Sequence, residues 1–183
     1  MSPQLSAAAR QQLLEVARRA LMASVAGGSF VPGEADAELR LPAGAFVTVR
    51  RRHDGELRAC VGLVRALQPL VESVARAAAA AVEDRRFDPM TSDELPLLRL
   101  EISALGPLLQ AAPESVQVGL HGVVVSRGGK SGLLLPQVAV EHGFSREVFL
   151  EQACRKAGLP RDAWRGTDCE IHVFTATVIS EED

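Results

Sequence analysis

The chain has very little aromatic side-chain surface: among its 183 residues there is no tyrosine, one tryptophan and six phenylalanines. Proteins that bind single-stranded nucleic acids generally stack bases on exposed aromatic rings, so this composition does not favour that class. Positive charge is also in short supply, because 20 lysines and arginines stand against 23 acidic residues and the formal net charge is −3. Non-specific nucleic-acid binding needs a basic face, and here only a local arginine patch would supply one.

The sequence also lacks the features of exported and membrane-spanning proteins. Its three cysteines are odd in number and widely spaced, so no disulfide framework is expected. No apolar run approaches the ~20 residues that span a bilayer. Residues 1–4 have no basic stretch leading into an apolar one, as a secretory signal would. We therefore expect a cytoplasmic protein with reduced thiols and no membrane contact.

The first half of the chain predicts two helices separated by a β-hairpin. Ser6 is a good N-cap for an apolar pattern at three- and four-residue spacing, which ends at the two glycines of residues 27–28. Residues 46–50 and 57–61 alternate between apolar and polar side chains around a tight-turn Asp-Gly pair, which is typical of a hairpin. A second, alanine-rich helix is expected over residues 69–82.

The second half predicts mainly strands. Residues 98–104 alternate as a half-buried strand does, and residues 123–125 and 133–135 form a second hairpin that is apolar on both faces, like central strands. A helix capped by Ser145 follows, and residues 171–179 read as one last strand. Consecutive strands joined by hairpins, with helices before, between and after them, indicate an α+β fold with a mainly antiparallel sheet and packed helices. Hydrophobic residues at 47% are enough for a folded core.

Cys60 is the most informative single residue for chemistry. In the strand 57–61 the odd positions are apolar and form the natural core face, so Arg58, Cys60 and Gly62 share the other face. Arg58 lies roughly 7 Å along the strand from Cys60, and a nearby guanidinium favours the reactive thiolate. Gly62 leaves room for a ligand or another backbone. Cys60 and Arg58 are therefore candidate catalytic residues; the structural alternative is a small buried hydrophobe.

Three further residues are candidates for the site. His121 precedes a strand and reads either as a turn residue or as a general base. Gln137 can offer its amide to a substrate or to local backbone. Arg86 is a candidate substrate contact that can instead pair with Asp84 at the end of the alanine-rich helix.

No cofactor or metal is identified from motifs. There is no glycine-rich nucleotide fingerprint and no phosphate-loop lysine motif. The four histidines lie in four different predicted elements and no Cys-x-x-Cys pair occurs, so the weaker alternative is a three-ligand site of Cys60, Glu170 and His172. The arginines of residues 50–52 can hold a phosphate or an acidic partner, or lie at a solvated strand end.

Several strings together resemble one known family. The sequence LRACVG at residues 57–62 is similar to the LRGCIG signature of the AMMECR-one domain family, known in prokaryotes as AmmeMemoRadiSam system protein A. The resemblance continues, in family order, with EDRRF at 83–87, HGVVV at 121–125, GLLLPQVA at 132–139 and CRKAGL at 154–159.

Two residues depart from the signature. Ala59 stands where the family usually has glycine, and its methyl group limits backbone approach at that strand. Val61 replaces isoleucine, which is conservative. The resemblance implies a single domain over residues 1–183, with a larger and a smaller subdomain around a cleft bordered by the signature. It also implies association with a Memo-like protein and a radical SAM enzyme.

Three functional hypotheses remain open. In the first the chain is an enzyme component, with Cys60 as nucleophile, Arg58 lowering its pKa or holding an anionic group, and His121 or His172 moving protons. In the second it is a non-catalytic adaptor or substrate-binding module, and the reaction takes place on the cofactors of its partner proteins. In the third a local arginine patch binds a nucleotide or RNA.

Overall fold

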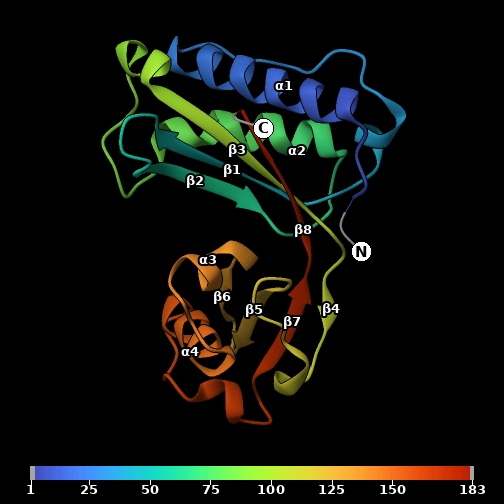
Figure 1. The fold of residues 1–183 in the computed structure, drawn as a ribbon, viewed down its shortest axis with the longest axis vertical. Coiled ribbons are helices and arrows are strands. Elements are labelled where there is room, and N and C mark those ends of the chain that lie inside the picture. The colour runs from blue at the N-terminus through green and yellow to red at the C-terminus, as the bar shows by residue number, and fades with distance from the viewer. Residues whose placement is uncertain (1–2, 182–183) are drawn as a thin grey trace. The chain divides into compact units, whose positions relative to one another are not determined.

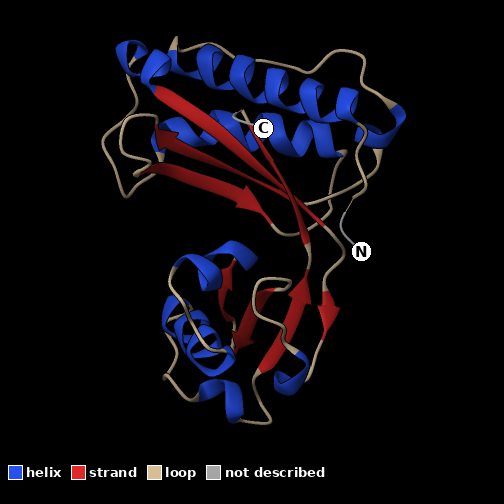
Figure 2. Cartoon of the chain, in the orientation of Figure 1, coloured by secondary structure: helices blue, strands red, loops and turns tan. Residues whose placement is uncertain are grey.

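The computed structural model describes residues 3–181, which divide into two compact units (Figure 1). The larger unit contains Pro3–Leu105 and the C-terminal segment from Thr177, and the smaller unit contains Gly106–Ala176. Each unit has its own sheet and its own helices (Figure 2). Met1 and Ser2, which belong to the segment considered above for an export signal, lie outside the described residues.

Two helices form one layer of the larger unit. Helix α1 (Ala7–Val25) begins as predicted, because the Ser6 hydroxyl accepts a hydrogen bond of 3.2 Å from the backbone N–H of Ala9. Helix α2 (Leu70–Ala80) is shorter than predicted, since its last turn tightens into the 3₁₀ helix η2 (Ala81–Glu83). The helices pack side by side on one face of the sheet (Figure 1), where the alanines of α2 allow a close approach.

The sheet of the larger unit has the strand order β2-β1-β3-β8. Its strands β1 and β2 are the predicted hairpin, closed by a turn in which Gly55 has a φ of +72°. Strand β2 is at the edge, and only one of its long sides pairs with another strand. The four strands span β1 (Ala45–Arg51), β2 (Leu57–Leu63), β3 (Leu98–Leu105) and β8 (Ala176–Ser180).

The inner face of this sheet supplies the core of the larger unit. Val47, Val49, Ala59, Leu100 and Ile102 are fully buried in one cluster with side chains of both helices. Alternation along a strand places these residues on the helix side. The prediction that the odd positions of residues 57–61 include the core face is thus confirmed at Ala59, while the side chains at 57 and 61 are only partly buried.

Short 3₁₀ helices frame the loops of the larger unit. Helix η1 (Ala37–Arg40) follows α1, and η3 (Ser92–Leu97) leads into β3. The predicted capping box opens η3: the Thr91 side chain and the Glu94 side chain each reach the other's backbone. The segment between η2 and η3 lies beside the N-terminal half of β2, as the hydrogen bonds described below show.

The smaller unit has a second four-stranded sheet, with the order β4-β7-β5-β6. Helices α3 and α4 pack on this sheet around a separate apolar core that contains Phe149 and Leu150. Ser145 caps α4 as predicted, by accepting a hydrogen bond from the backbone N–H of Val148. The elements span β4 (Leu109–Gln110), η4 (Pro113–Ser115), β5 (Gly122–Arg127), β6 (Lys130–Leu134), α3 (Pro136–Glu141), α4 (Arg146–Lys156), η5 (Ala163–Arg165) and β7 (Glu170–Phe174).

Two sequence predictions about the strands were wrong. The single last strand is two strands, because β7 pairs in the smaller unit and β8 in the larger one, and the break falls at Thr175. Strand β6 was expected to be central but lies at an edge; its apolar side chains are explained by α4, which packs against it.

The predicted fold class is confirmed: the chain is α+β, its strand pairs are antiparallel, and helices pack on each sheet. Among the residues that the structure describes, no helix is long and apolar enough to cross a membrane.

Candidate functional site

The signature motif forms the edge strand β2, and Cys60 lies at its centre. Cys60 is opposite Thr48 of β1, and the Thr48 hydroxyl lies 3.4 Å from the Cys60 sulfur and donates to it. The Cys60 side chain is half-buried and has this polar neighbour, so it is not sealed among hydrocarbon. The backbone N–H and C=O of Cys60 point away from β1, toward the open side of the sheet.

Asp84 and Arg86 cover that open side at Cys60. The Asp84 carboxylate accepts a 3.0 Å hydrogen bond from the backbone N–H of Cys60, and Arg86 donates to the backbone C=O of Cys60 at 3.2 Å. The same two side chains form an ion pair with N···O distances of 3.0 and 2.7 Å. We call this arrangement of Asp84, Arg86 and the Cys60 backbone the edge clasp. It takes the place of a neighbouring strand over one residue.

Asp84 is held in its charged form by the clasp. Its hydrogen bonds with the Arg86 guanidinium lower the Asp84 pKa to about 2, against the opposing effect of burial, and the Cys60 N–H contributes in the same direction. The pKa of Arg86 is raised by the same pair. The pairing of Arg86 with Asp84 that the sequence allowed is therefore present, although half of the Arg86 side chain remains exposed.

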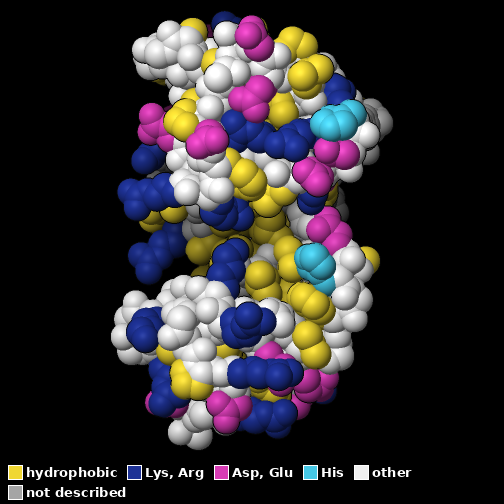
Figure 3. Space-filling view, turned by 90° about the vertical axis from the view of Figure 1, so that its left-hand side faces the viewer, with side chains coloured by type: hydrophobic (Ala, Val, Ile, Leu, Met, Phe, Trp, Pro, Cys, Tyr) yellow, Lys and Arg dark blue, Asp and Glu magenta, His cyan; other side chains and the backbone are white. Residues whose placement is uncertain are grey.

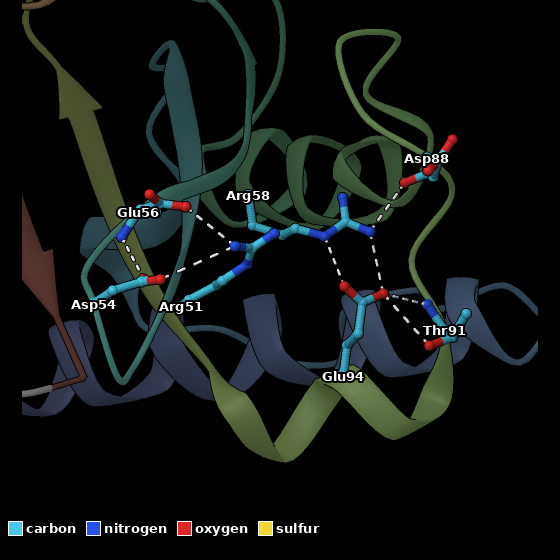
Figure 4. Close-up of polar contacts among 7 residues, drawn as sticks. All are labelled: Arg51, Asp54, Glu56, Arg58, Asp88, Thr91 and Glu94. Carbon is cyan, nitrogen blue, oxygen red and sulfur yellow. Dashed lines mark hydrogen bonds and ion pairs between the residues drawn. The ribbon is translucent and has the colours of Figure 1, made fainter.

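Arg58 directs its guanidinium to a carboxylate. Its Nε and Nη2 atoms donate to the two carboxylate oxygens of Glu94 at 2.7 and 3.1 Å, and Nη2 also donates to the backbone C=O of Asp88 at 2.9 Å (Figure 4). This pair lowers the pKa of Glu94. Only 5% of Arg58 is exposed, so a nearly buried charge has a matched counter-charge. From the sequence we expected the Arg58 guanidinium to favour a Cys60 thiolate. In the structure the guanidinium instead forms its ion pair with Glu94.

Gly62 fits against the neighbouring strand. A Cβ atom at this position would lie 2.1 Å from the backbone oxygen of Ala45 and 2.6 Å from Cα and Cγ of Phe46. Real Cβ atoms essentially never approach so closely. The close backbone approach that the sequence predicted at Gly62 is thus made by β1, which is sufficient reason for a glycine here.

His121 and Gln137 belong to the smaller unit, and the other four predicted site residues belong to the larger one. The Nδ1 atom of His121 accepts a hydrogen bond of 3.2 Å from the backbone N–H of Gln117, which favours the neutral ring protonated on Nε2. Burial lowers the pKa of His121 in the same sense. Gln137 lies half-buried in the first turn of α3.

A pocket of about 660 Å³ lies beside the N-terminal half of β2. Its lining contains four arginines and two acidic residues, Asp88 and Glu94. Figure 3 shows several Lys and Arg side chains on the face of the larger unit that is turned toward the viewer. We call this the arginine pocket; it is lined by Arg51, Arg58, Arg85, Arg86, Phe87, Asp88, Pro89, Thr91 and Glu94.

The arginines of the pocket are held in place to different degrees. Arg58 and Arg86 are fixed by their ion pairs and both lie near the Phe87 ring, with 5.8 and 5.6 Å from guanidinium carbon to ring centroid. Arg51 contacts Glu56 at 3.1 Å and Asp54 at 4.0 Å (Figure 4).

Arg85 is an exposed arginine of the pocket. It makes no ion pair with any residue between 3 and 181. Arg58 and Arg86 were predicted site residues and Arg85 was not, although it stands in the EDRRF string directly before Arg86 and Phe87.

No metal centre is formed within residues 3–181, where no group of three His, Cys, Asp or Glu side chains is placed to hold an ion. The alternative site of Cys60, Glu170 and His172 is not found among these residues. Cys60 belongs to the larger unit, and the other two lie on β7 of the smaller one. The three cysteines are all free.

Comparisons with known proteins agree along nearly the whole chain. The AMMECR1 family model matches residues 14–179. A protein of Methanopyrus kandleri is 41% identical, with 93% of this chain and 87% of that protein covered, and one of Aeropyrum pernix is 45% identical, with 94% and 79% covered. The crystal structure of an uncharacterized Pyrococcus horikoshii protein is 38% identical and superposes with a TM-score of 0.88, covering 93% of this chain and 90% of that one. The chain belongs to the AMMECR1 family.

Proposed function

We propose that this AMMECR1-family chain is a binding module whose arginine pocket holds an anionic group, a carboxylate or a phosphate, of a ligand. The observation that supports the proposal is the convergence of four arginines on one hollow of about 660 Å³. Guanidinium groups bind carboxylates and phosphates through charge-assisted, often paired hydrogen bonds.

The ion pairs of the pocket prepare it for a ligand. Arg58 uses Nε and Nη2 for its internal contacts, and Arg86 also uses Nε and Nη2, so each guanidinium is oriented before a ligand arrives. Ordering side chains in advance reduces the entropy lost on binding. Arg85 is exposed and brings a charge that no carboxylate within residues 3–181 pairs with.

The role of the module follows from the family resemblance. We infer that it works in the cytoplasm with a Memo-like protein and a radical SAM enzyme, and that it presents a substrate or docks on these partners. The support is the run of family motifs from LRACVG at residues 57–62 to CRKAGL at residues 154–159. In such a system the reactive chemistry can belong to the cofactors of the partners.

Calorimetric titration with pyrophosphate and with citrate tests the anion site. Saturable binding is expected, and Arg85→Ala should weaken it about fivefold to tenfold, the loss of one charge-assisted contact. Arg40→Ala is the matched control, because Arg40 is an exposed arginine of the same unit outside the pocket. Absence of saturable binding, or equal losses in the two variants, would contradict the proposal.

A second candidate function makes Cys60 a nucleophile. The observation in its favour is that Cys60 is only partly buried and that its sulfur accepts a hydrogen bond from the Thr48 hydroxyl. Co-purification of Cys60→Ser with the Memo-like and radical SAM partners separates the two functions. Retained binding with retained pathway activity supports the module, whereas retained binding with lost turnover supports catalysis by Cys60. Strongly salt-dependent binding of an RNA oligonucleotide would instead favour the nucleic-acid hypothesis.

A further inference from the structure

A second hollow, of about 310 Å³, lies at the other end of the edge strand. It lies between the last residues of β2, the loop that follows and one side of α2, and it shares no residue with the arginine pocket. Val61, Leu63, Leu67 and Ala77 give it an apolar floor and wall. Two of these side chains are unusually exposed for their type, Leu63 at 56% and Leu67 at 74%. Exposed leucines around one hollow are typical of an interaction surface.

The backbone beside this hollow is an open strand edge. Alternate residues of an edge strand direct N–H and C=O outward, and Cys60 is one such residue, because the edge clasp occupies both of its groups. Gly62 is the next outward position, two residues farther along β2. Within residues 3–181 no group is hydrogen-bonded to the outward N–H and C=O of Gly62. The edge is therefore closed at Cys60 and open at Gly62.

The hollow is positively charged. Arg65 and Arg76 line it, and none of the acidic side chains of residues 3–181 does. Arg76 donates to the side-chain oxygen of Gln68 at 2.8 Å, which holds it at the rim without neutralising it. An occupant with carboxylate side chains beside aliphatic ones would match both the charge and the apolar floor.

We propose that this end of β2 is a docking site for an extended, acidic and aliphatic segment of a partner protein. The segment pairs with the Gly62 backbone as a short added strand, places an aliphatic side chain between Leu63 and Leu67, and sets a carboxylate against Arg65 and Arg76. Strand addition of this kind obtains affinity from backbone hydrogen bonds and specificity from pockets for alternate side chains. The site is independent of the anion-binding function proposed above.

A second copy of the chain fits this edge poorly. The edge clasp interrupts strand pairing at Cys60, whereas edge-to-edge association of two copies needs a longer uninterrupted run of paired residues. A symmetric pair would also bring the Arg65 and Arg76 side chains of both copies to one interface, and like charges there oppose association. A short segment of opposite charge has neither difficulty.

NMR titration of the full chain with a capped peptide of sequence EVLDV tests the proposal. Saturable shifts are expected at the Gly62 amide and at the Leu63 and Leu67 methyl groups, together with slower hydrogen exchange of the Gly62 amide. The matched peptide KVLKV should bind at least about tenfold more weakly. No saturable binding, equal affinity for the two peptides, or shifts confined to Arg85 and Phe87 would overturn the proposal, as would unchanged exchange at Gly62.

Charge reversal on the protein provides the complementary arm. Arg65→Glu combined with Arg76→Glu should weaken EVLDV about tenfold and strengthen KVLKV, because the rim then carries the opposite sign. Both arginines are exposed, so the fold should persist, which the unperturbed amide spectrum of the core checks. Arg40→Glu changes the net charge by the same amount as Arg65→Glu or Arg76→Glu alone and is the control for each single reversal, and Arg85→Ala should leave EVLDV binding unchanged. Equal effects of Arg40→Glu and of either single reversal would contradict the site.

Discussion

The Asp84 carboxylate accepts a hydrogen bond from the backbone N–H of Cys60 across 24 positions of the chain, at 3.0 Å. This contact joins the loop after α2 to the middle of the signature strand. It also separates two hollows that lie at opposite ends of that strand, one rich in arginine and one mainly apolar. The stability of the signature strand therefore depends on a carboxylate outside the signature.

Replacing Asp84 should destabilise the larger unit. In Asp84→Asn the ion pair with Arg86 is lost and one carboxylate oxygen, an acceptor, is replaced by an amide NH2 group, a donor, so we expect a loss of about 2 kcal/mol in the free energy of unfolding. Chemical denaturation measures this loss. Asp93→Asn is the matched control, because Asp93 is exposed, and its effect should stay within about 0.5 kcal/mol. Equal effects of the two substitutions would contradict the clasp.

The same carboxylate should make stability depend on acid pH. The Asp84 pKa is about 2 in the folded chain and 3.8 as the ordinary value, so the unfolded chain binds the proton more readily. The Asp84 carboxylate therefore contributes roughly 2 kcal/mol to the free energy of unfolding. This contribution is complete above the pKa of Asp84 in the unfolded chain and is lost as the pH falls from about 5 to 2. Unfolding free energies measured through this range should fall less steeply for Asp84→Asn than for the unaltered chain. Parallel curves would contradict the prediction.

Glu94 should matter more for stability than its surface position suggests. It neutralises the nearly buried Arg58 and also accepts a 2.9 Å hydrogen bond from the backbone N–H of Thr91. Glu94→Gln leaves the Arg58 charge without its counter-charge, and we expect a loss of about 2 kcal/mol. Thermal unfolding compares it with Glu34→Gln, an exposed position of the same unit. A Glu94→Gln midpoint equal to that of the control would show that the pair contributes nothing.

Gly62→Ala should be strongly destabilising. The added methyl group meets the backbone of Ala45 and both backbone and ring of Phe46, and backbone atoms cannot move aside without distorting the β1–β2 pair. We expect a loss of about 3 kcal/mol or more in the free energy of unfolding. Gly33→Ala is the control, since a Cβ there has no neighbour within 4 Å. Normal stability of Gly62→Ala would mean that the space at Gly62 serves a ligand instead of β1.

The local elements could be read from the sequence because their signals are local. Ser6 and Ser145 cap helices, and Thr91 with Glu94 forms a capping box, since each cap depends only on residues a few positions away. The division of the last strand could not be read in this way. The residues on both sides of Thr175 favour extended structure, and which sheet each side joins depends on hydrogen bonds with distant strands.

Part of the candidate site could also be predicted from local signals. The sequence placed Arg58, Cys60 and Gly62 on one face of one strand, because the alternation of side chains is a property of the strand itself.

By itself the sequence determined the family, the α+β class and the strand that carries the signature. Only the tertiary structure decided that Arg58 pairs with Glu94, 36 positions away, and that Asp84 and Arg86 close the strand edge at Cys60. Ion pairs and contacts that cover a strand edge depend on which distant segments lie next to each other in the folded chain, and the spacing of residues along the sequence does not specify this.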